Sequence, residues 1–387
     1  MSLNFAASPR SSVGVEWELM LADPATGELV PRAPEVLDLL GPDVVGITGE
    51  LLTNTIEVMS DPHARVADAI EDVRERIATV RAATDTLGIA LLSAGSHPFA
   101  NWQDQSVTDK SRYHTLVERT QWWGRNMLIW GNHVHIGVDD REKAIPILEA
   151  LMTYLPHFLA LSASSPFWAG EATGYASNRS LVFQQLPTAG LPWPTRDWAG
   201  FEQYVGDLQH TGVIDDVTEV RWDIRPAPRW GTVEIRVFDA VPRLRDLGAL
   251  AALSQCLVEQ LSRRIDAGEP LDTQPPWFWR ENKWRAARYG LDAILIVDSA
   301  ANEMHVAEHL TGLLNELAPI AEGFDCVEEL ASVSELVARG AGYRGQLAAA
   351  EGAKGDLGAV IRHLAREFDE GVSAAADQPF LSSRHAR

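Results

Sequence analysis

Two carboxylates stand two residues apart near the start of the chain. Glu16 and Glu18 alternate with apolar residues, Trp17 among them, over residues 13–20. A period of two is typical of a β-strand and puts both carboxylates on one face, about 6–7 Å apart along the strand. Taken alone, this stretch fits a solvated edge strand as well as a strand that holds a divalent cation.

The same pattern recurs in three later stretches. They are residues 50–59 with Glu57, 132–139 with His133 and His135, and 232–238 with Glu234 and Arg236. Taken singly, Glu234 with Arg236 is also typical of a surface ion pair, and a lone histidine in 132–139 is also typical of a structural residue. One sheet gathering all four strands would carry, on the face opposite its aliphatic side, Glu16, Glu18, Glu57, His135, Glu234 and Arg236.

This residue set predicts metal-assisted chemistry. Oxygen-rich ligands favour Mg²⁺ or Mn²⁺ over Zn²⁺, and an arginine among them suits the transfer of a phosphoryl group from ATP. The same face could instead activate water in a metal-dependent hydrolase. The sequence contains neither a G-x-x-x-x-G-K-[ST] loop, nor a G-x-G-x-x-G turn after a strand, nor a G-x-S-x-G elbow.

The elements that must position these residues are unevenly distributed. Strand patterns, including 220–224 and 232–238, lie mostly within 13–240, whereas helical patterns dominate 245–370. This segregation predicts an α+β fold with an antiparallel or mixed sheet. We expect one catalytic domain over 1–387.

Other segments are predicted from their composition and periodicity. They are long helices at 64–87 and 142–163, a loose polar tail at 374–387, and an aromatic-rich and proline-rich segment at 164–200 that is long enough to serve as a lid.

Composition narrows the class of partner. The net charge of −21 argues against nucleic acid and anionic membranes as partners. Cys256 and Cys326 are expected to be buried free thiols, and the low cysteine count indicates a reducing compartment. Neither a signal peptide nor an apolar run of about 18 residues is apparent, so we expect a cytoplasmic protein.

Several motifs, in order along nearly the whole chain, resemble those of the carboxylate–amine ligases, also called type 2 glutamate–cysteine ligases. They are V-G-V-E-W-E-L at 13–19, T-N-T-I-E-V at 53–58 in the strand of Glu57, A-G-S-H-P-F at 94–99, R-Y at 112–113, G-N-H-V-H-I-G at 131–137, A-L-S-A-S-S-P-F-W at 160–168, T-G-Y-A-S-N-R-S at 173–180, R-P-A-P-R-W-G-T-V-E-I-R at 225–236 and E-N-K-W-R-A-A-R-Y-G-L-D at 281–292. Trp17 departs from the small or acidic residue usual there, but alternation turns it toward the helices.

The resemblance implies a glutamine-synthetase-like catalytic domain, with a curved, mainly antiparallel sheet flanked by helices. It also implies a ligand set for two or three Mg²⁺ ions, made of Glu16, Glu18, Glu57, His135 and Glu234. Glu50 is a weaker candidate, because strict alternation puts it on the face opposite Glu57 unless a bulge intervenes.

The resemblance further assigns catalytic and binding roles. Arg236 and Glu57 are the expected catalytic residues, and Arg236 would contact the transferred phosphoryl group. Arg112, Arg179 and Asn178 would bind the acidic substrate, since an arginine fork suits a carboxylate. Contacts with ATP are expected from Arg236, Asn282 and Lys283.

The implied reaction joins L-glutamate to cysteine at the expense of ATP, through γ-glutamyl phosphate. A different carboxylate or amine, the metal-dependent hydrolase and an amino-acid sensor without turnover are the alternatives. Relatives of this kind suggest a homodimer.

Overall fold

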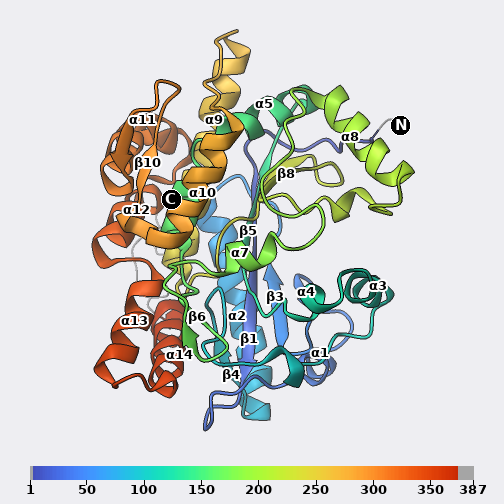
Figure 1. The fold of residues 1–387 in the computed structure, drawn as a ribbon, viewed down its shortest axis with the longest axis vertical. Coiled ribbons are helices and arrows are strands. Elements are labelled where there is room, and N and C mark those ends of the chain that lie inside the picture. Colours follow the sequence, from blue (N-terminus) through green and yellow to red (C-terminus); the bar gives the residue numbers. More distant parts are fainter. Residues whose placement is uncertain (1–2, 374–387) are drawn as a thin grey trace, which may run out of the picture.

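The computed structural model describes residues 3–373, so the predicted tail at 374–387 lies outside the described residues. Its main sheet has seven strands, every pair antiparallel (Figure 1). Across the sheet the strands are β2 (Ile47–Gly49), β3 (Thr55–Met59), β1 (Val13–Ala22), β5 (Asn132–Gly137), β9 (Thr232–Ile235) and β8 (Ile224–Ala227), with β4 (Ala90–Leu92) paired to β1. The α+β prediction is confirmed.

Two small antiparallel hairpins accompany this sheet. They are β6 (Phe167–Trp168) with β7 (Glu171–Ala172), and β10 (Ile294–Ile296) with β11 (Glu303–His305). The first hairpin lies within the predicted segment 164–200.

Strand β1 is the centre of the sheet, because it pairs with β3, β4 and β5. Its apolar side chains are buried, and the Trp17 ring packs edge-on against Phe368 at 5.6 Å between centroids. The Trp17 indole Nε1 donates to Ser93 Oγ at 2.8 Å. Trp17 thus anchors β1 to α14 (Leu357–Ser373), and the prediction that it faces the helices is confirmed.

Helices cover the apolar face of the sheet. The longest, α9 (Leu244–Asp266), packs against α2 (Val66–Leu87), α5 (Arg141–Leu151) and α12 (Val327–Arg339), and it also contacts β5 and β1. A single large core cluster joins the strand-rich and helical parts, from Val13 to Phe368.

The remaining helices flank these elements (Figure 1). They are α1 (Ala33–Leu40), α3 (Ser111–Thr120), α4 (Trp122–Arg125), α6 (Leu155–Ser162), α7 (Arg179–Phe183), α8 (Trp198–His210), α10 (Pro276–Tyr289), α11 (Val306–Phe324), α13 (Gly342–Gly352) and the short 3₁₀ turns η1 (Trp102–Asp104), η2 (Val217–Glu219) and η3 (Gly290–Asp292).

Three predicted elements differ in the structure. The helix expected at 142–163 is two helices, α5 and α6, bent by 66°. Pro156 in the first turn of α6 cannot supply the backbone N–H that one continuous helix needs. The strand expected at 220–224 begins only at Ile224 and is an edge strand, which explains why it tolerates Pro226.

Strand β3 is also shorter than the predicted 50–59, because a turn at Thr53 and Asn54 precedes it. Within residues 3–373, no single helix is long and apolar enough to cross a membrane. The bent pair α5 and α6 meets the length and composition requirement only when taken together, and its apolar side chains are buried in the core.

Candidate functional site

The antiparallel register gathers the predicted polar residues on one face of the sheet. Residues directly opposite one another in neighbouring strands point to the same side. The opposed pairs are Glu57–Glu18 between β3 and β1, Glu16–His133 between β1 and β5, and His135–Glu234 between β5 and β9. Acidic and imidazole groups therefore form one row across four strands.

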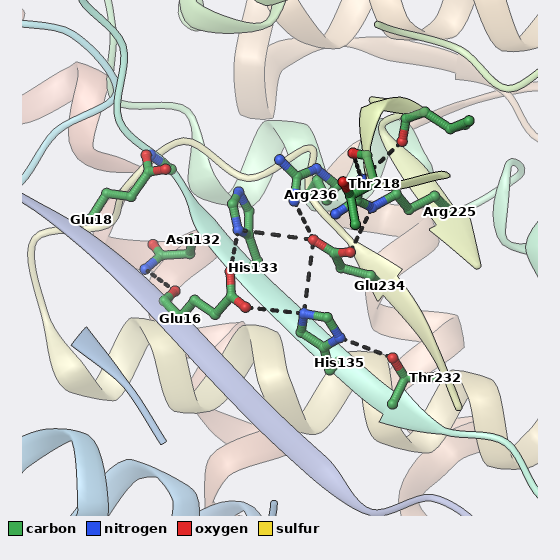
Figure 2. Close-up of polar contacts among 12 residues, drawn as sticks. Glu16, Glu18, Asn132, His133, His135, Thr218, Arg225, Thr232, Glu234 and Arg236 are labelled. Atoms are coloured by element: carbon green, nitrogen blue, oxygen red, sulfur yellow. Dashed lines mark hydrogen bonds and ion pairs between the residues drawn. The ribbon is translucent and has the colours of Figure 1, made fainter. Parts of the chain in front are cut away.

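Glu16 is at the centre of this row, between two histidines (Figure 2). Its Oε2 lies 2.6 Å from His133 Nδ1, and its Oε1 lies 3.2 Å from His135 Nε2. Burial opposes ionisation of Glu16, but hydrogen bonds from both imidazoles hold its pKa well below the usual range. Thr232 Oγ1, at 2.9 Å from His135 Nδ1, orients that ring from the other side.

The two histidines differ in their electrostatic surroundings. Burial, reinforced by the charge of Arg236, lowers the pKa of His133 to about 4. Burial also opposes the charged form of His135, yet the carboxylates of Glu234 and Glu16 outweigh it and raise the pKa of His135. His133 is therefore neutral, the form in which imidazole binds a metal.

Glu234 is fully buried and held between two arginines (Figure 2). Arg225 Nε donates to its Oε2 at 2.6 Å, and Arg236 Nη1 donates to its Oε1. Burial alone would raise the pKa of Glu234, but the charges of Arg225 and Arg236 lower it. Arg236 Nε is buried and, among the described residues, has no hydrogen-bond partner, so this side chain retains a donor for a ligand.

Two ligand sets for a cation share Glu16. The donor atoms of Glu16, Glu57 and His133 lie within 4.8 Å of one another, and so do those of Glu16, His135 and Glu234. Three carboxylates with two imidazoles form a donor set that fits Mg²⁺ or Mn²⁺.

Carboxyl groups crowd the β3 end of the row. Burial, together with the charges of Glu16, Glu50 and Glu18, raises the pKa of Glu57 well above its usual range. Burial and Glu50 raise the pKa of Glu18 to about 7, although Gly131 N donates to Glu18 Oε2 at 2.5 Å. Such mutual repulsion is relieved by a bound cation, which supports the fit of the donor set.

Glu50 belongs to this crowded end, against the expectation from strict alternation. Because β3 starts only at Thr55, the alternation does not extend back to Glu50. Tyr113 of α3 donates its hydroxyl to Glu50 Oε2 at 3.3 Å. Arg112 lies at the exposed rim, with its guanidinium 4.5 Å above the Tyr113 ring and hydrogen-bonded to the Tyr113 hydroxyl.

Arg179, the first residue of α7, is only 4% exposed. Its Nη atoms make long hydrogen bonds, of 3.4–3.5 Å, to the carbonyls of Arg236 and Val237, and its Nε is buried without a partner among the described residues. A Cβ on residue 131 would collide with this guanidinium, so Gly131 provides the space for it. Arg179 therefore has spare donors close to Glu18.

The other predicted binding residues lie as follows. Asn178 precedes Arg179 and is partly buried. Asn282 bonds to both backbone polar groups of Ile296, at 2.8 and 2.9 Å, and so fixes β10 to α10. Lys283 Nζ forms a buried ion pair with Asp223 Oδ2 at 2.6 Å. Both of these side chains already have partners within the protein, so contact with ATP stays a prediction for them.

Two members of the site were not in the predicted ligand set. The ligand set expected from the resemblance does not include His133, although its spacing from His135 puts both rings on one strand face. Arg225 lies in a proline-rich stretch whose strand pairing the sequence pattern does not show. The structure adds both through their contacts with Glu16 and Glu234.

Comparison with known proteins identifies the family. Residues 12–363 match the glutamate–cysteine ligase family 2 (GCS2). The chain belongs to this family. Two similar members of the glutamate–cysteine ligase family, both provisionally named glutamate–cysteine ligase 2, come from Clavibacter michiganensis (53% identical, 96% of this chain and 98% of the relative) and Mycobacterium ulcerans (51% identical, 95% and 93%).

Solved structures support the fold of this ligase family. A glutamate–cysteine ligase from Francisella tularensis, in complex with AMP, superposes with a TM-score of 0.67 at 14% identity, over 99% of this chain and 97% of the other. A bifunctional glutathione synthetase from Pasteurella multocida gives 0.65 at 15% identity, over 95% and 52%. The fold is that of the glutamine-synthetase-like ligases.

Proposed function

We propose that this protein is an ATP-dependent carboxylate–amine ligase that joins L-glutamate to an amine, with cysteine as the first candidate. The observation that carries the proposal is the row of carboxylates and imidazoles around Glu16, flanked by the partly unsatisfied guanidiniums of Arg236 and Arg179. Family membership and the AMP complex of the Francisella protein support the use of ATP.

The proposed reaction has two steps. A γ-carboxylate oxygen of glutamate attacks the γ-phosphorus of ATP, the bond to the β-phosphate oxygen breaks, and ADP leaves. The amine nitrogen then attacks the carbonyl carbon of γ-glutamyl phosphate, and phosphate leaves as the amide forms. Glu16, Glu57, Glu234 and the two histidines would hold Mg²⁺ or Mn²⁺ in the two ligand sets that share Glu16, and the cations would neutralise charge on the phosphates.

Side chains of the protein are expected to stabilise charge, accept a proton and bind the amino-acid substrate. Arg236 is held by Glu234, and its unpartnered Nε–H is expected to stabilise the negative charge on the phosphoryl group during its transfer. Glu57 lies among Glu16, Glu18 and Glu50 and is expected to take the proton lost by the attacking amine. Arg179, its neighbour Asn178 and the rim residue Arg112 are expected to bind the carboxylates of the amino-acid substrate.

The test is a substrate matrix. Purified protein is incubated with Mg-ATP and pairs of amino acids and amines, and ADP release and product mass are measured. The proposal expects ADP only when both a carboxylate and an amine are present, and a product of the condensed mass. Hydrolysis of an amide without ATP would favour the metal-dependent hydrolase instead, and no product from glutamate with cysteine would reassign the substrates.

A further inference from the structure

Asp239 is a buried acid that the proposed reaction does not use. It follows β9 and forms an antiparallel bridge with Gly131, the residue that donates to Glu18. It is fully buried; burial raises the pKa of Asp239, and the charge of Arg179 opposes this rise. A buried carboxylate is costly unless it is paired and hydrogen-bonded, so its partners matter.

The partners of Asp239 are the backbone and hydroxyls of the segment that leads to α7. Its Oδ2 accepts from Ser164 N at 2.9 Å and from Ser165 Oγ at 2.6 Å, and its Oδ1 accepts from Ser177 Oγ at 2.8 Å. These three residues come from the S-A-S-S and A-S-N-R-S motifs, which the metal site leaves unexplained. One carboxylate therefore ties together two separate parts of the chain.

This network ends at Arg179. Ser165 Oγ, which donates to Asp239, also accepts from the backbone N of Arg179 at 3.0 Å. Ser165 and Ser177 form a parallel bridge immediately before α7. Gly95 is required behind the carboxylate, because a Cβ there would lie 2.6 Å from Asp239 Cγ. Arg179, the first residue of α7, is thus held through its backbone N–H by Ser165 and through the bridge between Ser165 and Ser177 that precedes it.

We propose that Asp239 is the positioning residue of Arg179. Through Ser165 and Ser177 it fixes the backbone at the start of α7, and this backbone places the guanidinium next to Gly131. The free donors of Arg179 then face a carboxylate of the amino-acid substrate. This inference rests on the proposed function for the identity of that ligand, whereas the positioning itself does not depend on turnover.

The kinetic test uses Asp239→Asn with Asp246→Asn as a matched control. Asp246 is also buried and accepts hydrogen bonds from Arg339 at 2.6 and 2.7 Å, but it lies in α9. Asp239→Asn is expected to raise the KM for glutamate by about tenfold or more, with a smaller change in the KM for ATP. Asp246→Asn should leave both KM values near those of the wild type.

A double-mutant cycle separates positioning from general damage. If Asp239 acts through Arg179, then Asp239→Asn should change the glutamate KM by less than about twofold in an Arg179→Gln background. An effect of full size in that background would overturn the inference. Ser165→Ala is a milder variant, which removes the hydroxyl that joins Asp239 to the backbone N of Arg179. It is also expected to raise the KM for glutamate.

A spectroscopic test does not require activity. The ¹⁵N signal of the Arg179 Nε–H, assigned by its loss in Arg179→Lys, should shift in Asp239→Asn and remain in place in Asp246→Asn. An unmoved signal in Asp239→Asn overturns the inference even if the enzyme is active. A wild type that is inert in the substrate matrix would instead count against the proposed function, and the signal would still decide the role of Asp239.

Discussion

At the residue scale, Glu16 is the side chain on which both candidate cation positions depend. Its two oxygens contact different histidines, and each of these histidines belongs to a different ligand set. Hydrogen bonds from His133 and His135 hold its pKa low, which keeps it ionised and ready to bind a cation. No other residue in the row is shared between the two sets.

Glu16→Gln should therefore remove both cation positions at once. We expect turnover to fall by about three orders of magnitude or more, because neutralisation of the phosphate charge is lost. Mn²⁺ titration followed by electron paramagnetic resonance should show fewer bound ions than in the wild type, independently of activity.

A surface glutamate provides the control for this variant. Glu142→Gln removes an exposed carboxylate that pairs with the neighbouring Arg141 at 3.1 Å. It should retain the wild-type Mn²⁺ stoichiometry and activity. Full activity of Glu16→Gln would refute the assignment of the site.

At the element scale, β1 joins the polar row to the helices through Trp17, whose ring is fully buried. Trp17→Ala should cost about 3–5 kcal/mol in the free energy of unfolding, since it removes a large core side chain and leaves a cavity. The midpoint of urea denaturation measures this loss.

Trp230→Ala is the matched control, because Trp230 is 58% exposed. It should change stability by no more than about 0.5 kcal/mol. Equal losses in the two variants would mean that Trp17 does not anchor β1.

The loop after β4 is joined to the turn after β1 by a buried histidine. His97 Nε2 donates to Gly27 O at 2.8 Å, and its Nδ1 accepts from Ala100 N at 3.0 Å, so the ring must be neutral. Burial lowers the pKa of His97 to about 4, whereas an unfolded histidine titrates near pH ~6.5.

Stability from His97 is therefore complete above about pH 6.5 and is lost as the pH falls toward about 4, by up to about 3 kcal/mol. The urea midpoint of the wild type should fall more steeply between about pH 7 and pH 5 than that of His97→Gln. Parallel pH profiles would contradict this role.

The sequence pattern predicts much of this architecture but not all of it. Alternation identified which residues of β1, β5 and β9 share a face, because the strand period is a local property. Alternation failed at Glu50, since a turn delays the start of β3 until Thr55. It could not pair Arg225 with Glu234, since register depends on contacts distant in sequence. The role of Ser165 and Ser177 required the tertiary position of Asp239.

At the scale of the whole molecule, two thiols report on the packing of the helical layer. Cys256 of α9 and Cys326 at the start of α12 are buried and free, as predicted, with their Sγ atoms 3.8 Å apart. The hydrogen bond with the Cys326 thiol, together with burial, raises the pKa of Cys256, which suppresses the reactive thiolate.

Native protein should therefore react with a thiol reagent such as dithionitrobenzoate only slowly, and denatured protein should release about two equivalents at once. Rapid reaction of the folded protein would show that α9 and α12 separate readily.

The central position of β1 has a consequence for biosynthesis. Among the strands of the main sheet this one is synthesised first, and its partner β5 and the next strand, β9, are made roughly 100 and 200 residues later. At about 5–20 residues per second, β1 waits on the order of ten seconds or more before the sheet can close around it. During that interval its apolar side, with Trp17 at its centre, is a target for chaperones that bind nascent chains.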